Sequence, residues 1–534
     1  MTAGSFAGTG QLVRLALRRD RVLLPVWILL YAGMAALSAA GTVGLLPTVA
    51  SRVQAAAAIN DIPYFVALYG PVYDPSSLGA LALTKAGAAG GALVGVLAAF
   101  LVVRHTRGEE EAGRSELLGG GAVGRYAALA AAAAVSVGGC LLLGVLTCLG
   151  LVAVGLPVAG SVAFGLGWAG IGVAFAGIAA ITAQLSASAA TARGLALSVL
   201  AVTYVLRALG DTAREGSWVA ALRWLSPIGW AQQVRPYAGE RWWPLLLPAG
   251  CAVLAAAVAY ALASRRDLGT GIVTARPGRA TASAALRGPF TLAWRLQRTA
   301  FLWWLAAFAA IGAIYGVFTS SIGSMLDTPQ AKAVFTTLGG QKAMTDAFLA
   351  VAFGFCGIAA AAYGVQAALR PRTEESTMRA ELPLAAPVSR TRWVAGHLAF
   401  AVGGPVALLA AAGLAAGVAA AARDADAERI WPMVGAAVVQ LPAVWFVVGV
   451  AVLVVGAVPR WIAASWVALV GFVLLSEIGP LLRLDQWLLD LSPFTHIPRL
   501  PGADLTIAPL VWLTVLAAVL LTAGLAALRR REIR

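Results

Sequence analysis

Long apolar runs recur along the whole chain and limit the folds it can adopt. The 534-residue sequence is 60% hydrophobic and only 12% charged, whereas soluble domains carry roughly twice that share of charged residues. Runs of about 18 or more apolar residues are long enough to cross a bilayer as helices. The sequence therefore predicts an all-α polytopic membrane protein with about twelve transmembrane helices. They are expected near 22–45, 80–103, 126–152, 158–186, 193–210 and 242–264, and then near 299–320, 347–368, 393–421, 430–457, 460–478 and 507–528.

The distribution of basic residues indicates how the chain is oriented in the membrane. Its net charge of +15 would also suit a nucleic-acid-binding protein, but the arginines concentrate in alternate loops, which is the positive-inside pattern. We therefore expect both termini in the cytoplasm and no nucleic-acid partner. Abundant Ala, Gly and Arg with little Lys indicate a bacterial cytoplasmic membrane. The basic clusters lie at 14–21, 104–125, 265–298, 370–392 and 529–534.

A charged motif, R-x-E-E-x-x-x-R-x-E-L, occurs once in each half of the chain, at 107–117 and at 372–382. Three further matches follow the same order in both halves: a basic amphipathic stretch, a Leu-Ser-Pro sequence and a basic exit. Four ordered matches predict a duplication. Because each half holds an even number of predicted spans, we expect two parallel six-helix repeats. The expected division is 1–267 and 290–534, joined by a cytoplasmic linker at 268–289.

The repeated motif is a candidate docking surface. Its charges fall within two helical turns, and Glu110 with Arg114, like Glu375 with Arg379, has the i,i+4 spacing of an ion pair. A solvated helix that stabilises itself is the simpler alternative. Two equivalent charged helices, however, suit a partner with two equivalent grooves, such as a dimeric ATPase. The candidate docking residues are Arg107, Glu109, Glu110, Arg114 and Glu116, with Arg372, Glu374, Glu375, Arg379 and Glu381.

Three charged residues are predicted near the outer ends of membrane helices, where charges are rare and usually functional. Arg207 and Asp211 lie one turn apart, and Glu477 occupies the position equivalent to Asp211 in the second half. We interpret Arg207 and Asp211 as an ion pair that anchors an external loop. No acidic residue is predicted at the bilayer midplane, which argues against a proton-coupled transporter.

The sequence carries no recognisable catalytic, metal or nucleotide site. A phosphate-binding loop needs a Lys in a Gly-rich context, and Lys85, Lys332 and Lys342 all lack it. The three histidines are scattered, and the four cysteines lie in apolar segments without metal-ligand spacing. We therefore expect a transport subunit rather than an enzyme, with no cofactor of its own.

Taken together, these motifs resemble the permease of actinobacterial ABC exporters for polyketide antibiotics of the tetronasin type and for other drugs. The resemblance rests on the repeated motif, the Leu-Ser-Pro sequences, Arg207-Ala208-Leu209-Gly210-Asp211 and Arg241-Trp242-Trp243-Pro244, and it covers essentially the whole chain. It implies two fused six-helix units with a fold similar to ABC-2, or type V, exporters. It also implies a separately encoded ATPase dimer, which would hold ATP and Mg.

The resemblance further assigns roles to individual segments. It implies coupling helices within 104–125 and 370–392 that contact two copies of the ATPase. Interfacial connecting helices are implied at 8–21 and 288–298, and external re-entrant helices at 206–241 and 479–506. The first motif copy has a third acid, Glu111, and it has Gly113 where the second has Met378. The ATPase is therefore expected to hold the two halves unevenly.

The implied function is ATP-driven export of a hydrophobic or amphipathic drug or polyketide across a lipid membrane. An ion-coupled secondary transporter is the leading alternative, and a membrane enzyme is a weaker one. The substrate is expected to pass between the halves along aromatic side chains. The candidates for this path are Trp27, Tyr31, Phe100 and Tyr204, with Trp304, Tyr315, Phe355 and Tyr363.

Overall fold

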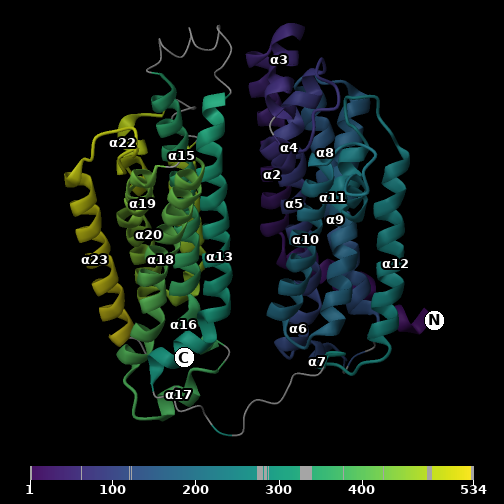
Figure 1. Cartoon of the computed structure of the whole chain (residues 1–534). Coiled ribbons are helices and arrows are strands. Elements are labelled where there is room, and N and C mark those ends of the chain that lie inside the picture. The colour runs from purple at the N-terminus through teal and green to yellow at the C-terminus, as the bar shows by residue number, and fades with distance from the viewer. Residues whose placement is uncertain are drawn as a thin grey trace. The chain divides into compact units, whose positions relative to one another are not determined.

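The computed structural model describes residues 3–530 except 62, 120, 122, 274–280, 282–285, 287, 325–339, 377, 425 and 478–483. Every regular element in this described part is a helix. The chain divides into two compact units, residues 1–278 and 279–534 (Figure 1). Each unit has its own hydrophobic core. The predicted linker at 268–289 lies largely outside the described residues, apart from its first six residues and a few near its end.

The first unit begins with a short 3-10 helix, η1 (Ala3–Phe6), and the helix α1 (Thr9–Arg19). Its six predicted spans correspond to long helices, joined by shorter ones at both ends of the bundle. The long helices are α2 (Leu23–Leu45), α5 (Leu78–His105), α8 (Ala127–Ala153), α9 (Val158–Leu185), α10 (Ala189–Thr212) and α12 (Leu246–Ala263). The shorter ones are α3 (Val49–Asn60), α4 (Pro63–Tyr69), α6 (Arg107–Glu111), α7 (Arg114–Gly119), η2 (Ala220–Leu225), α11 (Pro227–Gln233) and η3 (Trp243–Leu245).

The described part of the second unit has a similar succession of six long helices. Its long helices are α13 (Pro289–Ser324), α15 (Gly340–Ala368), α18 (Arg390–Asp424), α20 (Leu441–Ala457), α21 (Ala463–Glu477) and α23 (Ile507–Arg530). A further helix, α19 (Ile430–Val438), directly precedes α20. Short helices are α16 (Arg370–Ser376), α17 (Glu381–Ala385), η4 (Ala427–Arg429), η5 (Pro459–Trp461), α22 (Gln486–Leu489) and η6 (Pro493–His496). The amphipathic stretch predicted at 288–298 is not a separate helix here, because α13 runs through it without the break that separates α1 from α2. The span predicted at 430–457 is instead divided into α19 and α20 at Val439 and Gln440.

Eleven helices in the described residues are long and apolar enough to cross a membrane. The twelfth predicted span, 460–478, corresponds to the apolar helix α21, which has 15 residues. This confirms an all-α polytopic membrane protein. The sequence did not predict α3 and α4, because the segment between the first two spans has no strong apolar period. In Figure 1, α3 lies at the opposite end of the first unit from α6 and α7.

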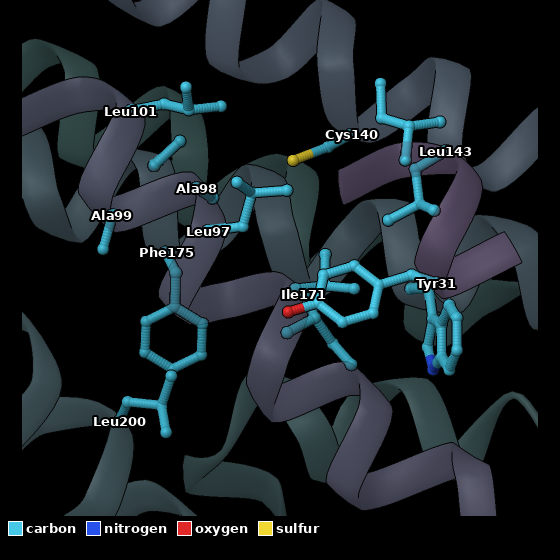
Figure 2. Close-up of a cluster of buried hydrophobic side chains, with 14 of the residues drawn as sticks. Tyr31, Leu97, Ala98, Ala99, Leu101, Cys140, Leu143, Ile171, Phe175 and Leu200 are labelled. Atoms are coloured by element: carbon cyan, nitrogen blue, oxygen red, sulfur yellow. The ribbon is translucent and has the colours of Figure 1, made fainter. Parts of the chain in front are cut away.

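Small residues let the helices of each unit pack closely, as is usual in membrane bundles, where close backbone approach replaces the hydrophobic effect. In the first unit, α9 contacts α5, α8, α10 and α12. A Cβ at Gly144 of α8 would collide with the backbone of Gly165 in α9, so both positions require glycine. Figure 2 shows the larger side chains that fill this core, among them Ile171 and Phe175 of α9. In the second unit, Gly312 of α13 faces the backbone of Ala412 in α18 in the same manner.

Candidate functional site

Both copies of the charged motif fold into two short helices joined by a tight turn, not into one continuous helix. The turn falls at Gly113 in the first copy, where φ is 70°, and at Met378 in the second, where φ is 59°. Both residues therefore have left-handed backbone conformations at equivalent positions of the motif. The turn separates a buried part of the motif, α6 or α16, from a more exposed part, α7 or α17. We call the end of each unit that carries these helices its motif end.

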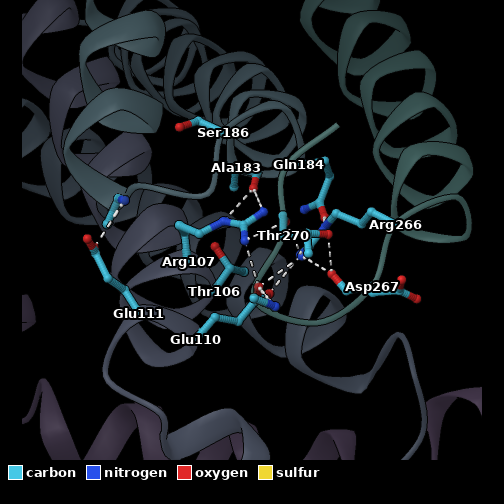
Figure 3. Close-up of polar contacts among 12 residues, drawn as sticks. Thr106, Arg107, Glu110, Glu111, Ala183, Gln184, Ser186, Arg266, Asp267 and Thr270 are labelled. Atoms are coloured by element: carbon cyan, nitrogen blue, oxygen red, sulfur yellow. Dashed lines mark hydrogen bonds and ion pairs between the residues drawn. The ribbon is translucent and has the colours of Figure 1, made fainter. Parts of the chain in front are cut away.

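Arg107 starts α6 and is fully buried. Its Nε and Nη2 donate to the carbonyl of Ala183, near the end of α9, at 2.9 and 2.6 Å. Its Nη1 donates to Glu110 at 2.8 Å and to the carbonyl of Thr270 at 2.9 Å (Figure 3). Arg107 thus fastens α6 to the end of α9 and to the segment after α12. A buried guanidinium is stable only when its donors are satisfied in this way.

Glu110 is clamped by a second arginine from a distant part of the chain. Arg266, just after α12, donates to both carboxylate oxygens of Glu110, at 2.9 and 2.7 Å. The side chains of Arg266 and Glu110 are only 9% and 10% exposed. The same guanidinium donates to the Gln184 side chain at 2.6 Å. The i,i+4 spacing predicted that Glu110 pairs with Arg114. This pair does not form, because Arg107 and Arg266 already bond the Glu110 carboxylate.

The start of the predicted linker is held against this clamp. Gly269 N donates to Glu110 at 3.3 Å, while Ile272 N and Val273 N donate to the carbonyls of Gln184 and Leu185 at 3.1 and 2.9 Å. Residues 268–273 thus lie along the end of α9 beside α6, as Figure 3 shows for Thr270. The sequence predicted that a cytoplasmic linker begins here, but these six residues form part of the first unit.

Arg114 pairs with Glu109 instead of Glu110. Its Nε and Nη2 donate to the two carboxylate oxygens at 2.7 and 2.8 Å. Arg19, the last residue of α1, reaches the same carboxylate at 2.5 Å. The hydrogen bonds to Glu109 raise the pKa of the Arg114 guanidinium, so the pair stays charged. Glu111 has a different role, since its carboxylate accepts from the first backbone N–H of α10, at Ala189, over 3.1 Å.

The second copy keeps one of these pairs and adds another that the first copy lacks. Arg372 donates to Glu375 at 3.2 Å, as Arg107 does to Glu110, and Arg370 pairs with Glu374 at 2.9 Å. The side chains of Glu374 and Glu375 are 7% and 4% exposed. The predicted partner of Glu375 was Arg379, but Arg379 follows the turn and is exposed. The left-handed turn at Met378 breaks the helical register that this prediction assumed.

The motif residues therefore separate into two groups. Arg107, Glu110, Glu374 and Glu375 face the interior of their own units and hold α6 and α16 in place. Arg114, Glu116, Arg379 and Glu381 are exposed at the motif ends. Met378 and Leu382 of the second copy are 66% and 82% exposed beside them. A surface of mixed charges and apolar side chains of this kind is suited to a protein partner.

Asp20, which was not among the predicted site residues, fixes the bend between α1 and α2. It is fully buried and bonds His105 Nε2, at the end of α5, over 2.5 Å. Arg104 lies 3.1 Å from its other oxygen. The signal for it was the single acid within an otherwise basic stretch, at the place where Gln297 stands in the second half. Gln297 is also buried, and it bonds His397 of α18 at 3.1 Å.

At the other end of the first unit, Arg207 and Asp211 form a buried ion pair of 3.3 Å. Arg207 also donates to the carbonyl of Ala67 at 2.6 Å, and its guanidinium lies over the Tyr204 ring. Arg223 of η2 approaches Asp211 to 3.7 Å. The pair thus ties α10 to α4 and to the segment after α10. Glu477, its predicted equivalent, is exposed at the end of α21.

Few of the aromatic side chains predicted along a substrate path are exposed on their unit. Phe100 and Phe355 are 41% and 51% exposed. Tyr31 and Tyr363 are packed within the cores. The other four are partly buried: Trp27, Tyr204, Trp304 and Tyr315.

Two comparisons with known proteins show which proteins this chain resembles. The profile of a family described as the C-terminal domain of the multidrug efflux system permease Rv1217c matches residues 286–529. The chain is also similar over nearly its whole length to the multidrug efflux system permease protein Rv1217c of Mycobacterium tuberculosis (strain ATCC 25618 / H37Rv). The two are 45% identical over 532 residues, which cover 99% of this chain and 96% of that protein.

Proposed function

Because this chain belongs to the Rv1217c family of multidrug efflux permeases, we propose that it is the membrane subunit of an ATP-driven ABC exporter. Its cargo would be hydrophobic or amphipathic drugs, including polyketide antibiotics of the tetronasin type, which leave across the bacterial cytoplasmic membrane. A separate ATPase, present as two copies, would hold the ATP and Mg. The fold would then be of the ABC-2, or type V, kind.

One observation carries this proposal: both units present an equivalent arginine–glutamate pair, whose carboxylate is at most 10% exposed, followed by the same left-handed turn. The pair of Arg107 with Glu110, and of Arg372 with Glu375, fixes the first short helix. The turn then projects α7 or α17 outward with its exposed charges. A protein that needs two equivalent contact points for an ATPase dimer would be built in this way. We therefore place docking on Arg114, Glu116, Arg379 and Glu381, and give the buried charges a positioning role.

The contacts of α6 would also transmit movement from the docking helix to the membrane helices. Arg107 joins α6 to the end of α9, and Glu110 joins it through Arg266 to the end of α12. A movement of α7 caused by the ATPase would therefore act on α5, α9 and α12 together. Such rigid transmission requires elements that move as one body, because packed interiors do not deform continuously.

The orientation follows from the same contacts. Arg19 of α1 pairs with Glu109, so the N-terminal helix lies at the motif end of the first unit. Leu528 and Arg529, near the end of α23, lie around a groove that also contains Glu375, at the motif end of the second unit. If the ATPase docks at the motif ends, both termini are cytoplasmic.

Charge reversal at the exposed positions tests the proposal. The tagged permease carrying Glu116→Lys or Glu381→Lys would be co-expressed with its neighbouring ATPase and purified in detergent. We expect Glu381→Lys to lose most of the bound ATPase while the permease itself elutes as a single species. Glu428→Lys, an equally exposed reversal on η4, serves as the control. Glu375→Lys would be a poor test, since that carboxylate is buried and its reversal would disturb packing.

Two results would count against the proposal. If both charge-reversal variants bind the ATPase normally, the exposed charges do not form the docking surface. If transport follows a proton gradient without ATP, the chain is a secondary transporter instead. The wild-type complex should also hydrolyse ATP faster when candidate drugs are added. Equal losses from Glu116→Lys and Glu381→Lys would contradict uneven docking, which the differences at Glu111 and Gly113 suggest.

A further inference from the structure

The first unit contains a cavity of about 470 Å³ at its motif end. This volume lies within the range of small-molecule sites. Its apolar part is formed by Leu12 and Leu15 of α1, by Leu268 after α12, and by Ala128 and Leu129 of α8. Its polar part holds Arg19, Arg125, Arg266, Glu109, Glu110 and Asp267. One region therefore suits a hydrocarbon chain and the other a charged group.

The helix α1 covers this cavity and is fastened at both ends. Before α1, Gly124 N donates to the carbonyl of Ala7 at 2.9 Å and Tyr126 N donates to that of Ser5 at 3.0 Å. After α1, Asp20 bonds His105. The cavity is thus a fixed feature of the fold beneath an amphipathic helix, and not a gap left by a loosely placed segment.

The charges at the polar end favour an anion. Glu109 is bonded by Arg19 and Arg114, and Glu110 by Arg107 and Arg266, so two guanidinium groups face each carboxylate. Two of these guanidinium groups, those of Arg107 and Arg114, lie behind the carboxylates and outside the cavity lining. With them, the four arginines exceed Glu109, Glu110 and Asp267 by one charge, while His105, which also faces this end, is bonded to Asp20.

Arg125 adds a further positive charge. Its Nη2 donates to three carbonyls, those of Ala263, Ser264 and Arg266, at 3.0 to 3.1 Å. These contacts hold the guanidinium in one orientation, while no carboxylate in the described part of the chain is bonded to it. Its Nε and Nη1 are left to donate to a ligand. Phosphate is bound well by such oriented guanidinium donors.

We propose that this cavity binds a phospholipid with an anionic headgroup from the inner leaflet. The phosphate would accept from Arg125 and Arg19, and one acyl chain would lie along Leu12, Leu15 and Leu129. Amphipathic helices lie at the headgroup level, and basic pockets between membrane helices on the cytoplasmic side suit anionic headgroups. The site rests on the orientation given under the proposed function. Because Glu109 and Glu110 form part of its wall, bound lipid would also brace α6.

The test measures lipid binding to the purified full-length permease in detergent, without ATPase or nucleotide. Native mass spectrometry would count bound dioleoyl phosphatidylglycerol, with dioleoyl phosphatidylcholine as the neutral probe. We expect one tightly bound phosphatidylglycerol per chain and weaker binding of phosphatidylcholine. Arg125→Ala should weaken phosphatidylglycerol binding roughly tenfold, the effect of one charge-assisted hydrogen bond. Arg18→Ala, an exposed position of α1 outside the cavity, should change little.

A second pair of variants tests the cavity without changing charge. Ala128→Trp would fill it from an exposed position of α8, whereas Ala134→Trp adds the same side chain at an exposed position of the same helix away from it. Only Ala128→Trp should lose the lipid. Equal binding of the two lipids, or equal binding by the two tryptophan variants, would overturn the proposal. Displacement of phosphatidylglycerol by a transported drug would also overturn it and make the cavity a drug site. Since no ATPase is present, none of these results depends on the exporter assignment.

Discussion

Gly113 and Met378 adopt the same left-handed backbone conformation at equivalent positions of the repeated motif, although one is glycine and the other is not. A side chain in this conformation costs roughly 1–2 kcal/mol. The second unit bears this conformational cost at the exposed Met378. The first unit has glycine at the equivalent position, where the left-handed conformation costs little. The turn itself is therefore the shared feature, and the residue that forms it differs between the halves.

Gly113→Ala should destabilise the first unit by about 1 kcal/mol through backbone strain alone. An added Cβ would meet no atom within 4 Å, so steric collision does not contribute. The melting temperature of the purified chain in detergent measures the effect. Gly138→Ala is a matched control, because it is also open but lies within α8, where alanine favours the helix. Equal melting of the two variants would contradict a strained turn.

Arg266→Gln should cost about 3 kcal/mol, since it leaves the nearly buried Glu110 with one guanidinium fewer. The neighbouring Arg265 is exposed, and Arg265→Gln removes the same charge without breaking a buried pair. We expect a lower melting temperature and earlier proteolysis near residues 268–273 for Arg266→Gln only. If both variants behave like the wild type, the clamp does not hold α6 in place.

Asp20→Asn should loosen α1 while the membrane helices stay folded. The substitution keeps the volume but removes the carboxylate that His105 and Arg104 contact, at a cost of about 1–3 kcal/mol. Hydrogen–deuterium exchange should increase in residues 9–20 and stay unchanged in α5. Asp61→Asn, at an exposed turn after α3, is the comparison. Unaltered exchange in α1 would show that its other contacts suffice.

Asp211→Asn should destabilise the opposite end of the first unit by about 3 kcal/mol, because Arg207 and Arg223 would remain buried with reduced counter-charge. Glu215 pairs with Arg223 as well, but its side chain is 82% exposed. Glu215→Gln should therefore change the melting temperature very little. Similar effects from the two variants would mean that Asp211 is better solvated than its burial indicates.

The sequence alone was sufficient for the membrane class, for most helix positions and for the repeated motif. Hydropathy is a reliable guide here because a bilayer leaves the backbone no partner but itself, so a long apolar run must become a helix. Even α21, short as it is, was found at the predicted place. Where α1 separates from α2, Asp20 bonds His105 of α5, whereas Gln297, at the equivalent position of the uninterrupted α13, bonds His397 of α18. Neither contact between distant segments is visible in the sequence.

The ion pairs of the repeated motif could not be predicted from the sequence. Their spacing identified Glu110 and Arg114 as charged neighbours. It did not reveal that Arg266, 156 residues further on, would bond the Glu110 carboxylate. A short-range ion pair on an exposed helix contributes only a few tenths of a kcal/mol, so partners brought near by folding readily replace it. The sequence by itself thus determined that this is an all-helical membrane protein with a charged motif in each half. Only the tertiary structure decided which of those charges are buried as clamps and which are left for a partner, because burial depends on contacts between distant segments.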